Sequence, residues 1–177
     1  MQTTSATMTT AANSNHRFNA DQQHAEPDAS DEPILAQARR RAQENAQEFA
    51  GSVTPVEAWQ LFSSAAATLV DVRSAEELRF VGHVPDALNV PWATGLSLNR
   101  NPRFVKELEN KAGGKQAVIL LLCRSGKRSA EAASAAARAG FSNVFNVLEG
   151  FEGDLNELHQ RGAQGGWRHW QLPWQQD

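Results

Sequence analysis

Apolar residues in this chain gather in short runs, with segments of helical periodicity between them. The run from Ala117 to Leu122 is continuously apolar and predicts a strand buried on both faces. A helix is predicted to begin at Thr54-Pro55-Val56-Glu57, which combines an N-cap threonine, a proline in the first turn and a glutamate three residues after the cap. Further strands are predicted over residues 68–72, 87–90 and 143–147, and further helices over residues 75–81, 102–111, 128–139 and 155–161.

Strands alternate with helices along the chain. This order predicts an α/β fold in which a parallel sheet is covered by helices on both faces. In such sheets, sites form at the carboxyl ends of the strands. Cys123 directly follows the apolar strand, and Asp71 lies at the end of another predicted strand. We therefore expect the chemistry of this protein at the carboxyl edge of the sheet.

The N-terminal third of the chain differs from the rest in composition. Residues 1–33 are polar, and Arg17 is their only Lys or Arg, which predicts a disordered, solvated tail. Residues 34–52 are predicted as a helix and linker; the helix has a thin, mostly alanine stripe that buries little area and is expected to stop at Gly51. A single packed domain is predicted over residues 53–177.

Composition and charge exclude several classes of protein. No apolar run could span a membrane, and the net charge of −3 gives no reason to expect a nucleic acid or a membrane as partner. The single cysteine excludes an intramolecular disulfide framework and a cysteine-rich zinc site, and it favours a reducing compartment. Residues 1–20 lack the apolar segment of a secretory signal, so we predict a cytoplasmic protein. An organellar transit peptide is the alternative, because acids are absent there.

The segment after the apolar strand has the composition of an anion-binding loop. It reads Cys123-Arg124-Ser125-Gly126-Lys127-Arg128-Ser129 and leads into an alanine-rich helix. Gly126 permits a tight turn, and the backbone amides together with the helix N-terminus favour negative charge. Arg124, Lys127 and Arg128 add cations. A thiol in that setting is expected to be partly ionised at neutral pH, and the thiolate is its nucleophilic form.

The loop resembles the active-site loop of the rhodanese family of sulfurtransferases. Sulfur transfer and phosphoryl or arsenate transfer both use a cysteine in an arginine-ended loop, but cysteine phosphatases and arsenate reductases have five residues between the two. Here four residues separate Cys123 from Arg128. Further rhodanese-like segments surround the loop in the family's order, over about residues 53–175: Asp71-Val72-Arg73 with Glu77, the stretch from Gly82 to Pro91, Leu148-Glu149-Gly150-Phe151, and Gly166-Trp167 with Leu172-Pro173-Trp174.

The resemblance implies a single rhodanese-like domain with a central parallel sheet of about five strands. It implies a sulfurtransferase that moves a sulfane sulfur from thiosulfate or a similar donor to cyanide or a thiol, through a persulfide on Cys123. The partners it implies are a small anionic sulfur donor and a thiol or protein-cysteine acceptor. No metal or organic cofactor is implied. The amides of residues 124–129 would hold the persulfide, and the loop cations would attract the donor.

Other functions remain open alongside this one. A persulfide carrier or sensing module would load Cys123 for a protein partner but turn over thiosulfate poorly. A cysteine phosphatase or arsenate reductase is disfavoured by the short loop and by the lack of a resolving thiol, and an inactive scaffold by the presence of Cys123.

Several residues around the loop have more than one possible role. Asp71, Arg73 and Glu77 are predicted to form a structural ion-pair and loop-bracing set rather than to act in catalysis. Arg128 is expected either to donate hydrogen bonds to loop carbonyls or to contact substrate. Three departures from the family pattern are expected to affect the loop shape beside the pocket: the stretch from Glu77 to Gly82 is one residue longer than is common, Asp86 stands where glycine is usual, and Phe151 replaces a second glycine.

Overall fold

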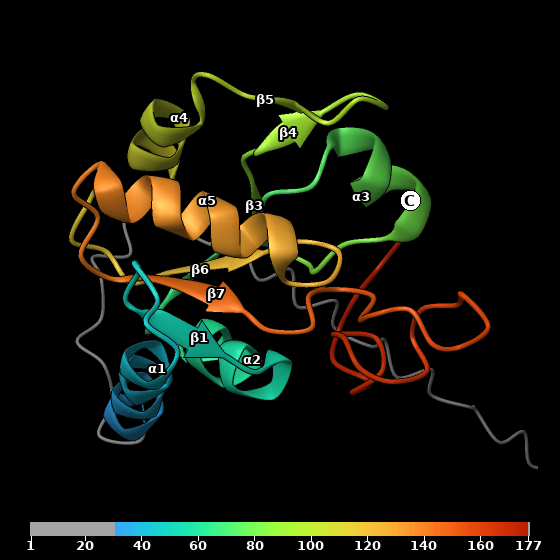
Figure 1. The fold of residues 1–177 in the computed structure, drawn as a ribbon, viewed down its shortest axis with the longest axis horizontal. Coiled ribbons are helices and arrows are strands. Elements are labelled where there is room, and N and C mark those ends of the chain that lie inside the picture. The colour runs from blue at the N-terminus through green and yellow to red at the C-terminus, as the bar shows by residue number, and fades with distance from the viewer. Residues whose placement is uncertain (1–30, 177) are drawn as a thin grey trace, which may run out of the picture.

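A five-stranded parallel sheet forms the centre of the protein, in the order β1-β7-β6-β2-β3 (Figure 1). A computed structural model describes residues 31–176, so most of the predicted tail lies outside the described residues. The predicted α/β fold class, with its parallel sheet, is confirmed. The strands of the sheet are β1 (Gly51–Val53), β2 (Thr68–Asp71), β3 (Leu88–Asn89), β6 (Ile119–Leu122) and β7 (Val144–Val147).

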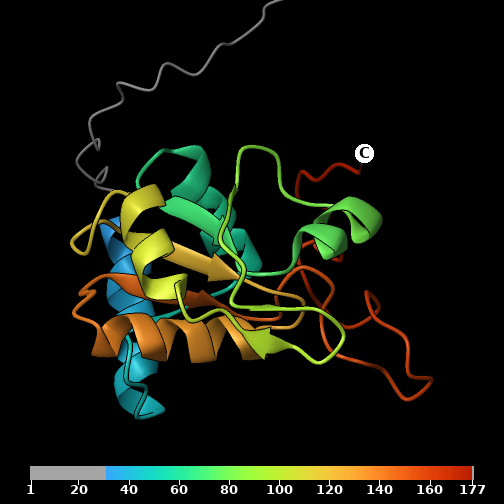
Figure 2. The ribbon, with the colours of Figure 1, turned by 90° about the horizontal axis from the view of Figure 1, so that it is seen from above.

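Helices cover both faces of the sheet. Helices α4 (Phe104–Lys111) and α5 (Lys127–Arg138) lie on one face, and α1 (Glu32–Glu44) and α2 (Pro55–Ser63) lie on the other (Figures 1 and 2). Helix α3 (Ala75–Val81) stands beyond the carboxyl edge of the sheet, close to the C-terminus (Figure 1). Within residues 31–176, no helix combines the length and apolar character needed to cross a membrane.

The burial of β6 explains why the apolar run from Ala117 to Leu122 contains no polar residue. All four of its residues are fully buried. Ile119 and Leu121 face the core beneath α4 and α5, and Cys123 continues this alternation. Leu120 and Leu122 face the second core, beneath α1 and α2. A strand covered on both sides must be apolar on both, as predicted.

Helix α2 begins with the predicted capping box. The Thr54 hydroxyl accepts a hydrogen bond from the Glu57 amide, and the Glu57 carboxylate accepts one from the Thr54 amide. Glu57 also receives two hydrogen bonds from Arg41 of α1, both at 2.7 Å. The first turn of α2 is therefore linked to the N-terminal helix as well as to its own backbone.

The N-terminal helix ends earlier and packs more closely than its sequence predicted. It ends at Glu44, where the side chain of Asn45 donates to the Arg41 carbonyl, so the prediction that Gly51 stops it was wrong. Gly51 instead opens β1 at the edge of the sheet. A Cβ atom there would lie 2.4 Å from the Ala38 carbonyl oxygen. Small residues on both elements allow this approach, and Ala38 becomes fully buried.

The predicted helix over residues 155–161 is absent, and that prediction was wrong. The Asn156 side chain instead accepts hydrogen bonds from the amides of Leu158 and Gln160, and His159 adopts a left-handed φ of 57°. Side-chain hydrogen bonds of this kind compete with helix formation. A short antiparallel pair, β4 (Ala93–Thr94) and β5 (Asn99–Arg100), was not predicted.

Candidate active site

Cys123 lies where β6 ends, at the carboxyl edge of the sheet. Helix α5 begins only four residues later, at Lys127. The tight connection depends on Gly126, whose φ of 83° is left-handed. Cys123 is 1% exposed, so its sulfur lies at the base of the loop rather than on the surface. The structure therefore places the cysteine where the sequence predicted it.

The carbonyl groups at the start of the loop are held by a second segment. The Phe151 amide donates to the Cys123 carbonyl at 2.8 Å, and the Glu152 amide donates to the Arg124 carbonyl at 2.9 Å. Gly150 makes this contact possible, because a Cβ atom there would lie 2.5 Å from the Cys123 carbonyl oxygen. The segment after β7 thus fixes the backbone of the cysteine loop.

Unlike these carbonyl groups, the backbone N–H groups of residues 124–129 have no hydrogen-bond partner in the described part of the protein. Three of the six belong to the first turn of α5, where the helix dipole also favours negative charge. Consecutive amides in a turn before a helix form a concave site for an anion.

Within residues 31–176, the sulfur of Cys123 has one side-chain hydrogen-bond partner. The Ser129 hydroxyl lies 3.2 Å from Sγ and 2.7 Å from Oδ1 of Asn146 on β7. All three residues are buried, with Asn146 only 4% exposed. The sequence pointed to Cys123 and Ser129 but missed Asn146. The available signal was a lone amide in an otherwise apolar strand.

Arg128 pairs with Glu77, a partner that the sequence did not indicate. Its two terminal nitrogens donate to the two carboxylate oxygens of Glu77, at 2.8 and 2.6 Å. Hydrogen bonding to Glu77 raises the pKa of Arg128, and Cys123 and Asp71 lie close enough to contribute in the same direction. The pair joins the first turn of α5 to α3 beside the cysteine loop.

The Glu77–Arg128 pair makes the stability of the fold depend on pH. Burial alone would raise the pKa of Glu77, but hydrogen bonds from Arg128 and from the Ser74 backbone outweigh it, so its pKa lies below the ordinary value of 4.5. A carboxyl group of this kind stabilises the fold above its unfolded pKa, and this contribution is lost as pH falls through the folded pKa.

Glu77→Gln is therefore expected to lower the free energy of unfolding at neutral pH by roughly 1–3 kcal/mol. The variant should also lose less stability than the wild type as the solution is acidified below about pH 4.5. Urea unfolding across a pH series measures both effects. Glu57, whose pKa is also lowered, is retained in both proteins, so some acid sensitivity remains. Parallel pH profiles for the two proteins would contradict this account of Glu77.

Asp71 and Arg73 form a separate, fully buried ion pair at the end of β2. The Arg73 side chain donates to both carboxylate oxygens of Asp71, with the shortest contact at 2.6 Å, and to the Gly82 carbonyl at 2.9 Å. Its guanidinium lies 4.2 Å from the ring centre of Phe151. The three supporting residues from the sequence thus divide into two ion pairs, one buried here and one formed by Glu77 with Arg128.

Two of the departures from the family pattern have separate structural explanations. Asp86 adopts a φ of 63°, a conformation in which glycine is usual and which aspartate tolerates better than most residues. Phe151 is fully buried and stacks against Arg73, and its ring also lies 6.1 Å from that of Trp174. Phe151 therefore fills the core beneath the loop.

Two cations of the loop remain exposed. Arg124 points to solvent, and the Lys127 side chain is 83% exposed, with its amino group 3.9 Å from the Asp154 carboxylate. An exposed pair at that distance contributes little to stability. Both side chains are therefore available to an anion that approaches the loop.

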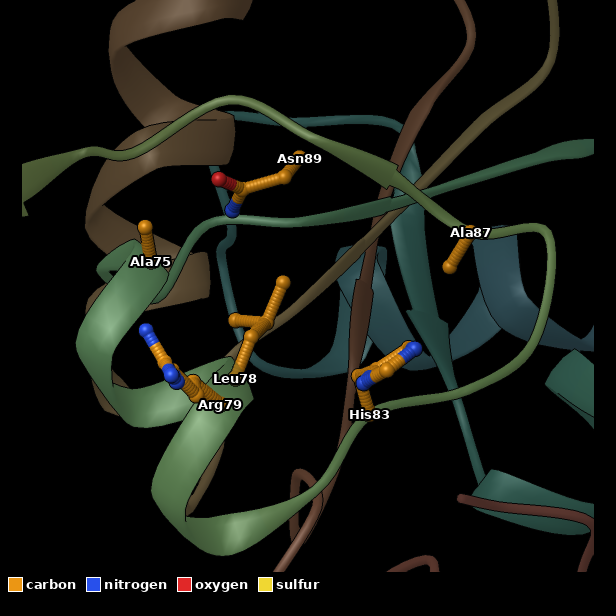
Figure 3. A pocket seen from close by; sticks show the side chains of 6 residues that line it. All are labelled: Ala75, Leu78, Arg79, His83, Ala87 and Asn89. Carbon is orange, nitrogen blue, oxygen red and sulfur yellow. The ribbon is translucent and has the colours of Figure 1, made fainter. Parts of the chain in front are cut away.

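A hollow of about 530 Å³ lies beside α3 but does not include the cysteine (Figure 3). The residues of α3 that line it, Ala75, Leu78 and Arg79, lie on the side of the helix away from Glu77. The Asn89 amide is already bonded to the Asp71 and Arg73 carbonyls, so it is structural. The hollow and the cysteine loop thus lie on different sides of α3. Residues 31–176 contain no group of three or more potential metal ligands.

The fold and the loop together define a class of protein. A parallel α/β sheet carries a buried cysteine at its carboxyl edge, within a short amide-lined turn before a helix. Residues 54–157 match the family model of the Rhodanese-like domain, and the chain belongs to that family of sulfurtransferase-type and related domains. None of the curated proteins compared with the chain matches it.

Solved structures agree with this assignment. The protein Rv0390 of M. tuberculosis is 42% identical, with a TM-score of 0.62, and the match covers 71% of this chain and 97% of that one. Alr3790 of Anabaena sp. (16% identity, TM-score 0.51) matches over 70% of this chain and 81% of its own. BH2092 of Bacillus halodurans (18% identity, TM-score 0.51) matches over 80% and 85%. The last two share the fold alone.

Proposed function

We propose that this protein is a sulfurtransferase that carries a sulfane sulfur on Cys123. The donor is a small sulfur-containing anion such as thiosulfate, and the acceptor is cyanide in an assay or a thiol in the cell. One observation carries the proposal: the consecutive N–H groups of residues 124–129, unpaired within residues 31–176, follow a cysteine at the base of the loop. Such a site suits an anionic sulfur better than a neutral ligand.

The first half-reaction forms the persulfide. The Cys123 thiolate attacks the outer sulfur of thiosulfate, a new sulfur–sulfur bond forms, and the bond to the sulfonate sulfur breaks with its electron pair. Sulfite leaves, and the negative charge of the thiolate moves to the outer sulfur of the persulfide. In the second half-reaction an acceptor anion attacks that outer sulfur. The sulfur–sulfur bond of the Cys123 persulfide breaks, and the acceptor carries the outer sulfur away as thiocyanate or as a new persulfide. The Cys123 thiolate is thereby restored.

The side chains of the loop have distinct roles in this scheme. Arg124 and Lys127 are exposed and attract the dianionic donor, while the loop amides hold the charge that forms on the outer sulfur. Arg128 is hydrogen-bonded to Glu77, and this pair links the loop to α3. Proton transfer to a separate base is not needed once Cys123 is ionised, and the scheme uses neither a metal nor an organic cofactor.

Incubation with thiosulfate followed by intact-mass measurement tests the proposal. We expect a gain of one sulfur atom, about 32 Da, that is removed by cyanide and is absent from Cys123→Ser. Because only the cysteine thiol is changed, Cys123→Ser serves as the matched control. If neither a mass gain nor sulfite release is found with the folded protein, thiosulfate is not its donor; a failure with other sulfane donors as well would overturn the sulfurtransferase proposal.

Two further measurements separate the alternatives. Full loading of Cys123 combined with slow steady-state turnover of cyanide would favour a persulfide carrier that serves a protein partner. Hydrolysis of an aryl phosphate by the wild type but not by Cys123→Ser would favour a phosphatase. We expect turnover with cyanide and no phosphate hydrolysis, since a loop of four intervening residues crowds a tetrahedral oxyanion.

A further inference from the structure

Asn146 is a polar residue in a strand that is otherwise apolar. It is the third residue of β7, between β6 and β1, where it pairs with Leu121 on one side and Ser52 on the other. Only 4% of its surface is exposed. A buried amide costs free energy unless it is hydrogen-bonded, and its partner here is the Ser129 hydroxyl, 2.7 Å from Oδ1.

The Ser129 hydroxyl has two neighbours but only one proton. When Cys123 is a thiol, its S–H can donate to Ser129 Oγ while the hydroxyl donates to Asn146 Oδ1, so Sγ, Oγ and Oδ1 each take part in a hydrogen bond. When the sulfur is an anion, both Sγ and Oδ1 are acceptors. One proton cannot serve them both, and one buried acceptor would be left unpaired.

The asparagine amide can resolve this conflict. Rotation of the amide by half a turn exchanges Oδ1 for Nδ2 with almost no change in shape. Nδ2 has no acceptor within residues 31–176, so the rotation breaks no hydrogen bond there other than the one from Ser129. Nδ2 can then donate to Ser129 Oγ while the hydroxyl donates to the anionic sulfur. Hydrogen bonds linked in this way strengthen one another.

We propose that Asn146 is a positioning residue that stabilises the anionic form of Cys123 through Ser129. Its amide accepts from Ser129 when Cys123 is a thiol, and it turns to donate when the sulfur carries charge. The proposal rests on the proposed function in one respect, since thiolate and persulfide are the anions that the sulfur-transfer scheme requires. It assigns to Asn146 no contact with the substrate.

Charged groups on the elements that pack around the loop stay the same when Asn146 is changed, so the comparison among variants is not affected by them. They come from every element around the loop: Arg124, Lys127, Arg128 and Glu131 from the loop and α5, Asp71 and Arg73 from the end of β2, Glu77 from α3, and Glu149 from the segment after β7.

The pH dependence of Cys123 alkylation by iodoacetamide tests the proposal. Ser129→Ala is expected to move the pH of half-maximal rate upward by about one unit or more, because the anion loses its hydroxyl donor. Asn146→Leu, which is similar in size but cannot donate, should move it upward by about half a unit. The double variant should match Ser129→Ala alone, since Asn146 acts only through the hydroxyl. Thermal unfolding checks that each variant is folded.

Three results would overturn the proposal. Asn146→Leu could leave the pH of half-maximal alkylation rate unchanged, it could lower that pH, or it could raise it equally in the wild type and in the Ser129→Ala background. A downward shift would mean that Asn146 competes with the sulfur for the proton. If Asn146→Leu does not fold, Asn146→Asp replaces it. Asn146→Asp should raise the pH of half-maximal alkylation rate more in the protein that has Ser129 than in the Ser129→Ala background. Alkylation needs no sulfur donor, so these results are independent of whether thiosulfate is a substrate.

Discussion

Asp71→Asn is expected to lower the free energy of unfolding by about 3–5 kcal/mol. The substitution keeps the shape of the side chain but leaves the Arg73 charge without a counter-charge at a site with no exposed surface. One terminal nitrogen of Arg73 already has no hydrogen-bond partner within residues 31–176, so few other polar contacts stabilise its charge. Urea unfolding, followed by the fluorescence of the five tryptophans, measures the change.

Glu48→Gln is the matched control for this prediction. Glu48 pairs with Arg138 across the surface, where both side chains are about 60% exposed. Removal of the exposed charge should change stability by less than about 1 kcal/mol. Similar losses for the two variants would show that burial does not set the contribution of the Asp71–Arg73 pair.

Gly150→Ala should slow persulfide formation by about 100-fold, because small displacements of reacting groups have effects of that order. The new methyl group would lie 2.5 Å from the Cys123 carbonyl oxygen and 2.6 Å from the Ser125 nitrogen, so the loop backbone must shift. The left-handed φ of 65° adds strain of about 1–2 kcal/mol. The rate is measured from the mass gain after rapid mixing with thiosulfate.

Gly162→Ala separates strain from displacement. Gly162 also has a left-handed φ, of 86°, but a Cβ atom there would meet nothing within 4 Å. This variant should lose a similar amount of stability from strain while forming the persulfide at nearly the wild-type rate. An equal loss of rate in both variants would mean that contact between Gly150 and the loop is not what positions Cys123.

Strong local signals account for what could be predicted from the sequence. The apolar run before Cys123 predicted a central strand, and Thr54 with Glu57 predicted a capped helix, because each pattern depends on neighbouring residues. The end of α1 was misplaced, since its stop depends on an Asn45 side chain rather than on the glycine that follows. Residues 155–161 had helical composition, but Asn156 satisfies their backbone locally instead.

The candidate site shows the same division between local and distant information. The order of residues in the loop revealed the cysteine and the amide turn that follows it. The partner of Arg128 did not follow from the order, because Glu77 lies 51 positions earlier in the chain. Asn146 is also distant in sequence from Cys123, and only the packing of β7 beside β6 brings it under the loop.

Glu77 has two structural tasks, and they couple two parts of the molecule. One of its oxygens accepts both the Ser74 amide, which closes the first turn of α3, and a nitrogen of Arg128. Fraying of α3 would therefore also break the pair between Glu77 and Arg128 and release Arg128, in the cysteine loop, from α3. The helix has only seven residues and no fully buried one, so little else holds it in place. The opening of α3 and the loss of the Glu77–Arg128 pair are therefore coupled, and amide hydrogen exchange in α3 would report the free energy of this opening.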